Sequence, residues 1–139
     1  MWRSFAAVAV GGAIGTGARY GIDLLVPHDT AGTLALSTII VNVVGSFVLG
    51  VLVARLWPHP GVPLWLKAGV GTGILGSFTT FSAVTLNAVA GAVEANLLTA
   101  VGALVFSTLL GLMAAWAGLA TGGARLRRDA AIPDGGADL

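Results

Sequence analysis

The chain has 139 residues, of which 56% belong to the apolar set and only 9% are charged. A soluble domain carries about a quarter of its residues charged, and the mean hydropathy here is +0.93. The 21 glycines lie within apolar runs, where small residues let membrane helices approach closely. The net charge of +1 gives no indication of nucleic-acid binding, and the absence of cysteine excludes disulfides, thiolate metal sites and a cysteine nucleophile. The composition therefore predicts an all-α integral membrane protein.

Four stretches are long and apolar enough to cross a membrane, which takes roughly 20 residues. They cover about residues 4–26, 34–54, 64–93 and 96–120. The first follows Arg3 as a signal peptide would, but the run is too long, no clean cleavage site is present and three more spans follow. The third is too long for a straight span and is crowded with Gly, Ser and Thr between Gly69 and Ser82. The polar, glycine-rich remainder, residues 121–139, is expected to be a disordered tail.

The charges that flank the spans predict their orientation, because Lys and Arg gather in short cytoplasmic loops. One side of the membrane would carry six of these residues, which are Arg3, Arg55, Lys67, Arg125, Arg127 and Arg128. The other side would carry Arg19 as its one cation, together with Asp23, Asp29 and Glu94. Both termini are therefore expected in the cytoplasm.

The hexapeptide Gly71-Thr72-Gly73-Ile74-Leu75-Gly76 matches the dinucleotide-binding fingerprint GxGxxG. That motif works only where it follows a strand and opens a helix. Here it lies inside an apolar span, so helix packing through small residues is the favoured interpretation.

Two polar residues within the spans have both a structural and a functional interpretation. Asn42, in the middle of the second span, could form an interhelical hydrogen bond or offer N–H donors to an anion, and its position alone does not decide between them. Arg19 lies near the end of the first span, where it could extend its guanidinium to the interface or pair with Asp23. A structural role is the favoured interpretation of Arg19.

The stretch Gly76-Ser77-Phe78-Thr79-Thr80-Phe81-Ser82 predicts a weak point in the third span. Successive Ser and Thr side chains compete for backbone hydrogen bonds, and unwound backbone inside a membrane must be buried in protein or line a cavity. Its freed carbonyls could then coordinate a cation, as in the broken helices of transporters. A simple kink is the alternative interpretation.

The chain offers no arrangement of residues that suits an enzyme. His28 and His59 lie in loops, neither HExxH nor GxSxG occurs, and the carboxylates lie at span ends, in loops or in the tail. A proton-coupled transporter, including a small four-span drug exporter, needs a carboxylate within the membrane. A passive pathway or a structural membrane protein remains.

Three ordered motifs resemble the Fluc/CrcB family of fluoride channels. The stretch Gly11-Gly12-Ala13-Ile14-Gly15-Thr16-Gly17-Ala18-Arg19-Tyr20 resembles the family's first-helix signature. Residues 38–50, TIIVNVVGSFVLG, resemble its second-helix motif, and residues 73–82, GILGSFTTFS, resemble its third-helix break. The resemblance covers residues 5 to 120. It implies four spans with a broken third helix, an antiparallel dual-topology dimer in the cell (inner) membrane, and passive export of fluoride.

The resemblance also implies roles for individual residues. A structural, non-transported sodium ion would lie at the dimer centre, held by the backbone carbonyls of Gly76 and Thr79 of each subunit. The carboxamide that donates toward fluoride matches Asn42, and the first phenylalanine of the aromatic box matches Phe81, whose ring edge can face an anion. Three hydroxyl residues would complete the polar lining, namely Thr80, Ser82 and Ser107.

Two departures from the family pattern bear on the number of working pores. The second phenylalanine of the box corresponds to Val84, and the usual fourth-helix tyrosine corresponds to Ala103. Because each pore draws on both subunits, a lost ring would impair both pores of a homodimer but only one if a partner chain kept its own. With the six-to-one charge bias, this suggests one half of a heterodimer with a homologous, inverted partner. The alternative is a non-conducting structural subunit of such a heterodimer.

Overall fold

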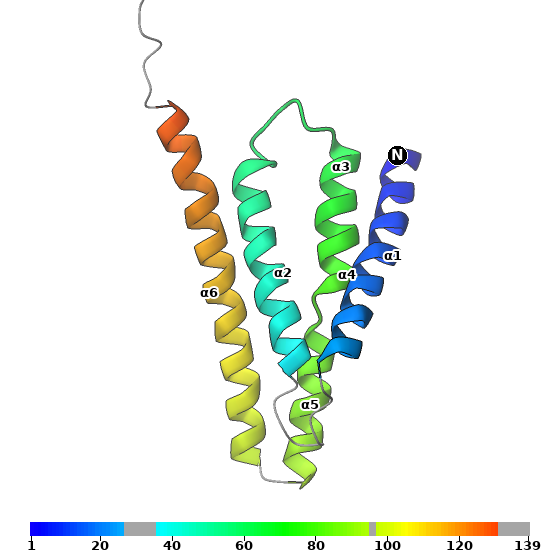
Figure 1. The fold of residues 1–139 in the computed structure, drawn as a ribbon, viewed down its shortest axis with the longest axis vertical. Helices are drawn as coiled ribbons and strands as arrows, with labels where there is room; N and C mark the ends of the chain where they lie inside the picture. The colour runs from blue at the N-terminus through cyan, green and yellow to red at the C-terminus, as the bar shows by residue number, and fades with distance from the viewer. Residues whose placement is uncertain (27–35, 95–96, 131–139) are drawn as a thin grey trace, which may run out of the picture.

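The computed structural model describes residues 1–26, 36–94 and 97–130, which form a helical bundle without strands in those ranges. The elements are α1 (Trp2–Leu25), α2 (Leu36–Arg55), α3 (Leu64–Ala68), η1 (Gly69–Leu75), α4 (Gly76–Phe78), α5 (Phe81–Glu94) and α6 (Leu97–Ala130). Their axes run roughly along one direction, and α3 to α5 form one broken column (Figure 1). The all-helical prediction is confirmed over these residues.

Three helical stretches of the described chain are long and apolar enough to cross a membrane. They are Leu36–Arg55, Leu64–Val93 and Leu97–Gly123. These stretches agree closely with three of the four spans that the sequence predicts. The remaining predicted span corresponds to α1, which has 24 residues but carries Arg3, Arg19, Asp23 and several glycines. The chain is therefore built as a multi-pass membrane protein.

The last helix ends later than the sequence predicts. The expected boundary lies at residue 120 with a disordered tail beyond it, whereas α6 continues to Ala130. Beyond residue 120 the helix still packs against α2 at Gly122, where a Cβ would lie 2.7 Å from the Cβ of Ala54. No proline interrupts the sequence before Pro133. Residues 131–139 of the expected tail lie outside the described residues.

Glycines bring two pairs of helices into backbone contact. On α1, a Cβ at Gly11 would meet the carbonyl oxygen of Gly69, and a Cβ at Gly15 would meet that of Ile74. A Cβ on Gly73 would in turn lie 3.0 Å from the carbonyl oxygen of Val8. The hexapeptide 71–76 therefore serves helix packing, as the sequence analysis favours.

A second glycine pair joins α2 to α6. A Cβ at Gly50 would meet the carbonyl oxygen of Ala115, and one at Gly118 would meet that of Phe47. The two interfaces together hold α1 and α6 against the central elements, which contain the interruption of the third span.

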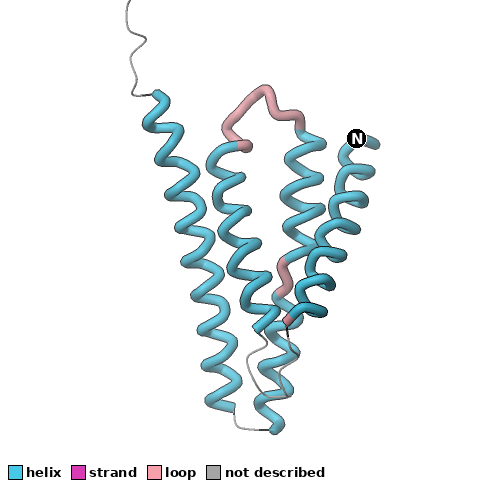
Figure 2. Tube along the Cα trace, in the orientation of Figure 1, coloured by secondary structure: helices cyan, strands magenta, loops and turns pink. Residues whose placement is uncertain are grey.

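The third span changes its helical form before it breaks. It begins as α3, continues through the π-helical turn η1 with its three glycines, and ends its first half with the short α4. Thr79 then adopts an extended conformation, with φ −76° and ψ 151°. A loop separates the two halves of the column at this point (Figure 2). The interruption predicted from residues 76–82 is thus present, and it is a break in the hydrogen-bond ladder rather than a kink.

Candidate functional site

Two threonines terminate the helices on either side of the break. The backbone N–H of Thr79 donates to the carbonyl of Leu75 at 3.0 Å, and its hydroxyl donates to the same carbonyl at 2.9 Å. Thr80 caps the following helix, because its hydroxyl accepts a hydrogen bond of 3.2 Å from the N–H of Ala83. The Thr80 hydroxyl also lies 3.1 Å from that of Ser82. The two threonines thus fix where α4 ends and α5 begins.

Asn42 on α2 binds the backbone at the break. Its carboxamide oxygen accepts a 2.7 Å hydrogen bond from the N–H of Thr80, and its nitrogen donates a 2.8 Å bond to the Thr80 carbonyl. The interhelical bonding that the sequence analysis considered is therefore present. A carboxamide nitrogen has two hydrogens, so one remains for another acceptor.

The break leaves backbone carbonyls without partners. The N–H of Thr80 donates to Asn42 and that of Ala83 to a hydroxyl, so neither continues the helical ladder. Within the described residues, the carbonyls of 76–79 have no hydrogen-bond donor. The described residues also contain no group of three His, Cys, Asp or Glu side chains that could hold a metal ion. Backbone oxygen is thus the ligand that this region offers a cation.

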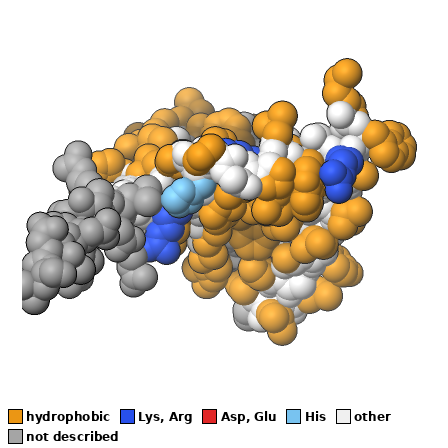
Figure 3. Space-filling model, turned by 90° about the horizontal axis from the view of Figure 1, so that it is seen from above, with side chains coloured by type: hydrophobic (Ala, Val, Ile, Leu, Met, Phe, Trp, Pro, Cys, Tyr) orange, Lys and Arg blue, Asp and Glu red, His pale blue; other side chains and the backbone are white. Residues whose placement is uncertain are grey.

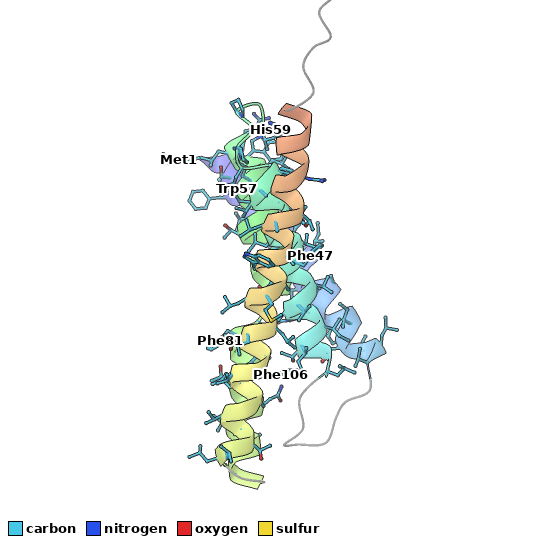
Figure 4. All side chains as sticks on the ribbon, turned by 90° about the vertical axis from the view of Figure 1, so that its left-hand side faces the viewer. Met1, Phe47, Trp57, His59, Phe81 and Phe106 are labelled. Carbon is cyan, nitrogen blue, oxygen red and sulfur yellow. The ribbon has the colours of Figure 1, made fainter. Side chains whose placement is uncertain are left out.

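A cleft of about 260 Å³ lies beside the break, between α2, α5 and α6. Phe81 is 64% exposed, whereas Val84 and Ser107 are buried. Figure 4 shows Phe81 in the lower half of the molecule, at the side of the helices. The lining residues are Asn42, Ser46, Thr79, Thr80, Phe81, Val84, Ser107, Thr108, Gly111, Leu112 and Ala115. None of them is charged, so the cleft is lined by hydroxyl, carboxamide, aromatic and aliphatic groups.

A second cavity, of about 230 Å³, lies between α1, α2 and α5. It is lined by Arg19, Asp23, Thr38, Val41, Thr80, Ser82, Ala83 and Leu86. In the described residues Arg19 and Asp23 face this cavity without an ion pair between them. Thr80 lines both cavities, so the pair that it forms with Asn42 lies where they meet.

Comparison with known proteins identifies the family. The family model for CrcB-like proteins, described as camphor resistance (CrcB), matches residues 6–119. The chain belongs to the CrcB family. Relatives include the fluoride-specific ion channel FluC 2 of Geobacillus kaustophilus, 37% identical over 84% of this chain and 90% of the relative. The fluoride-specific ion channel FluC of Paracoccus denitrificans is 39% identical over 88% of this chain and 96% of its own length. FluC 1 of Brucella melitensis, also named a fluoride-specific ion channel, is 41% identical over 85% of this chain and 94% of its own length.

The CrcB fold brings most of the predicted site residues together, in two groups. Asn42, Phe81 and Ser107 line the first cleft, Arg19 and Ser82 line the second cavity, and Thr80 lines both. Thr79 lines the first cleft as well. Gly76 lines neither cavity, and it is exposed on the surface of the single chain.

Several polar residues that line these cavities were not predicted from the sequence. Thr38 and Ser46 lie four residues before and after Asn42 on α2, and residues four apart share a helix face. This spacing could have identified Thr38 and Ser46 as lining residues. Thr108 donates its hydroxyl to the carbonyl of Leu104 at 2.7 Å, and no spacing of polar residues distinguishes it from an ordinary helical threonine.

Proposed function

We propose that this chain is a subunit of a fluoride-specific ion channel, which exports fluoride passively and thereby lowers its toxic concentration in the cytoplasm. Relatives at 37–41% identity bear that name over nearly their whole length. The single observation that carries the proposal is the uncharged cleft at the break, where Asn42, Phe81 and Ser107 meet. The relatives are named as channels, so the proposed activity is transport and not catalysis.

The chemistry of the cleft suits a small anion. The second hydrogen of the Asn42 carboxamide and the hydroxyl hydrogens of Thr80 and Ser107 are donors that replace part of the anion's hydration. The edge of the Phe81 ring carries positive partial charge. The lining contains no carboxylate to repel an anion. Ser82 and Arg19 would continue the polar path through the second cavity.

The cleft supports assembly with a second subunit. Phe81 is 64% exposed and several polar groups line the open cleft, whereas polar groups facing lipid are costly. We propose that a second, antiparallel subunit covers this side and completes the pore. In this arrangement α1 is the fourth membrane-spanning helix, and both termini of this chain lie in the cytoplasm of a cell (inner) membrane.

The backbone carbonyl oxygens at the break suit a structural sodium ion. Among the described residues, no group donates a hydrogen bond to the carbonyls of Gly76 and Thr79, and Gly76 is exposed. An antiparallel partner would present the same carbonyls from the opposite side. These four oxygens would hold the ion, which would stabilise the interface and would not be transported.

The lining at Val84 supports a heterodimer. Val84 lies in the first cleft, where the family pattern has a second ring, and Ala103 is absent from its lining. This chain therefore contributes one phenylalanine, Phe81, to the cleft. We propose a homologous partner of opposite orientation that supplies the missing ring. In the alternative, this chain is a structural subunit whose partner provides the whole pore.

Fluoride efflux from liposomes tests the proposal. The chain purified alone and reconstituted with sodium should be silent or slow, and coexpression with an inverted homologue should give fast efflux. Fast efflux by the chain alone would establish a homodimer and overturn the heterodimer. Tags that report the location of the termini should give a uniform orientation, and an even mixture would contradict it. Substitution of Asn42 or Phe81 without loss of flux would favour the structural subunit.

A further inference from the structure

Apart from the two cavities at the break, the surface has a groove at the end of the molecule where the N-terminus lies. It is an apolar groove of about 400 Å³ between α1 and α3, lined by Arg3, Ala6, Ala7, Val10 and Trp65. The helices meet closely below it, since a Cβ on Gly69 would lie 3.0 Å from the Cβ of Ala7. The small side chains of α1 leave the groove open above this contact. We call it the α1–α3 groove.

Arg3 is an available cation at the mouth of the α1–α3 groove. Its guanidinium carbon lies 6.0 Å from the centroid of the Trp65 ring, and no carboxylate in the described part of the chain pairs with it. Lys67 differs, because its amine donates hydrogen bonds to the carbonyls of Trp57 at 2.8 Å and His59 at 3.2 Å. The arginine therefore has unused donors beside an apolar surface.

The surroundings of the groove are those of a membrane interface. Trp2 and Trp65 lie in the first turns of α1 and α3, and Figure 4 shows Trp57 and His59 at the same end as Met1. Tryptophan is enriched where bilayer meets water. Figure 3 looks onto this end and shows hydrophobic side chains, with basic side chains and a histidine among them. Among the described residues, Arg3, Arg55 and Lys67 lie at this end, and their positive charge favours anions.

We propose that the α1–α3 groove binds an anionic glycerophospholipid. The lipid phosphate accepts hydrogen bonds from the Arg3 guanidinium, and one acyl chain lies against Ala6, Val10 and the Trp65 ring. A zwitterionic lipid has the same phosphate, but its ammonium group cancels the charge, so the site prefers the anionic headgroup. The inference needs only a membrane-embedded chain and does not depend on fluoride conduction.

Native mass spectrometry of the purified chain with equal amounts of phosphatidylglycerol and phosphatidylcholine tests this site. We expect preferential retention of phosphatidylglycerol, and Arg3→Gln should lower that preference about fivefold, the effect of one basic residue near a membrane surface. Arg55→Gln is the matched control, because it removes the same charge at the same end, at the end of α2, outside the groove. Arg3→Lys should retain most of the preference. Ala6→Leu should reduce retention of both lipids by filling the groove.

Three results would overturn the proposal. Equal losses in the Arg3→Gln and Arg55→Gln variants would show diffuse attraction to the basic end. Unchanged retention in both Arg3→Gln and Ala6→Leu would show that the groove holds no lipid. If Ala6→Leu changed the oligomeric state and left lipid retention unaltered, a second copy of the chain would be the occupant. Arg3 and Ala6 are exposed, so the variants should fold, and their melting temperatures check this.

Discussion

Asn42 and Thr80 exchange two hydrogen bonds across 38 residues of sequence, with lengths of 2.7 and 2.8 Å. The carboxamide takes the place of the missing helical turn, because it accepts the N–H that would otherwise bond to the carbonyl of Gly76. The extended conformation of Thr79 is therefore stabilised by a residue on another helix. The same pair lies between the two cavities, so the break and the proposed pathway depend on one side chain.

Asn42→Ala should lower both the stability and the fluoride flux of the channel. The substitution leaves the N–H and carbonyl of Thr80 without partners, and a buried unsatisfied group costs about 1–3 kcal/mol. A comparable loss in the transition state corresponds to a decrease in rate of about fivefold to a hundredfold. Melting temperature in detergent and efflux from liposomes measure the two effects, using the assembly that conducts.

Asn87→Ala is the matched control for the carboxamide. Asn87 lies on α5 outside both cavities, so its loss should leave flux within about twofold, as is usual for sites without a special contact. Asn42→Asp retains an acceptor for Thr80 but adds a negative charge to the cleft, and it should abolish flux. A conducting Asn42→Asp variant would contradict the role of this residue in an anion pathway.

Phe81→Ala should reduce flux with little effect on the stability of the single chain. The ring is 64% exposed, so its removal leaves no buried cavity, whereas the loss of a favourable ring-edge contact is worth about 1 kcal/mol, or roughly fivefold in rate. Phe106→Ala is the control, since this ring is also exposed but lies outside both cavities. Equal effects of the two variants on efflux would argue against Phe81 as a lining residue.

Much of the fold could be predicted because apolar length and glycine content are local properties of the sequence. Three predicted spans agree with the helices to within a few residues. The run of Gly, Ser and Thr correctly placed the break, since these residues weaken a helix wherever they occur. The predicted boundary at residue 120 was wrong, since α6 continues to Ala130. Just beyond that boundary Gly122 contacts Ala54 and Val51 of α2, and such a tertiary contact cannot be read from local sequence. The polar composition of the tail gave no sign of that contact.

The geometry of the site was less accessible from the sequence. Position alone left the role of Asn42 open, because the identity of its partner depends on how α2 meets the break. The division of the lining residues between two cavities depends on the approach of α1, which the contacts of Gly11 and Gly15 determine. Spacing could have identified Thr38 and Ser46, yet it could not have shown that Thr80 belongs to both cavities.

Asp23→Asn should accelerate fluoride efflux at low ionic strength. Its carboxylate lines the second cavity with Arg19, and a negative charge in a cavity lowers the local concentration of anions. An interaction of about 1 kcal/mol corresponds to roughly fivefold, and salt should diminish it. Arg19→Gln should act in the opposite direction. Efflux measured at two salt concentrations checks the sign, and an unchanged rate in both variants would show that this cavity is not on the pathway.

Removal of sodium should destabilise the assembled channel. If the carbonyls of Gly76 and Thr79 hold the ion, each tenfold rise in sodium above its Kd adds about 1.4 kcal/mol to the free energy of unfolding or dissociation. Melting temperature should therefore rise with sodium and stay constant with an equal concentration of N-methylglucamine. The same result in both salts would remove the support for a structural sodium ion.

Gly15→Ala should destabilise the bundle, and Gly17→Ala on the same helix should not. A methyl group at Gly15 would overlap the carbonyl oxygen of Ile74, whereas nothing lies within 4 Å of one at Gly17. Forcing the two backbones apart should cost about 1–3 kcal/mol. At Gly17 the better helix propensity of alanine should be neutral or gain up to about 1 kcal/mol. Denaturation of the two variants in detergent measures the difference.

The Gly15→Ala and Gly17→Ala variants also test how the break in the third span is positioned. The contacts of Gly15 and Gly11 fix α1 against η1, and η1 leads through the short α4 to the break at Thr79. Gly15→Ala should therefore reduce fluoride flux together with stability, while Gly17→Ala leaves both intact. If Gly15→Ala lowered stability and left flux unchanged, the position of η1 would be independent of this contact. The alignment of the two halves of the third span would then depend on α2, through Asn42.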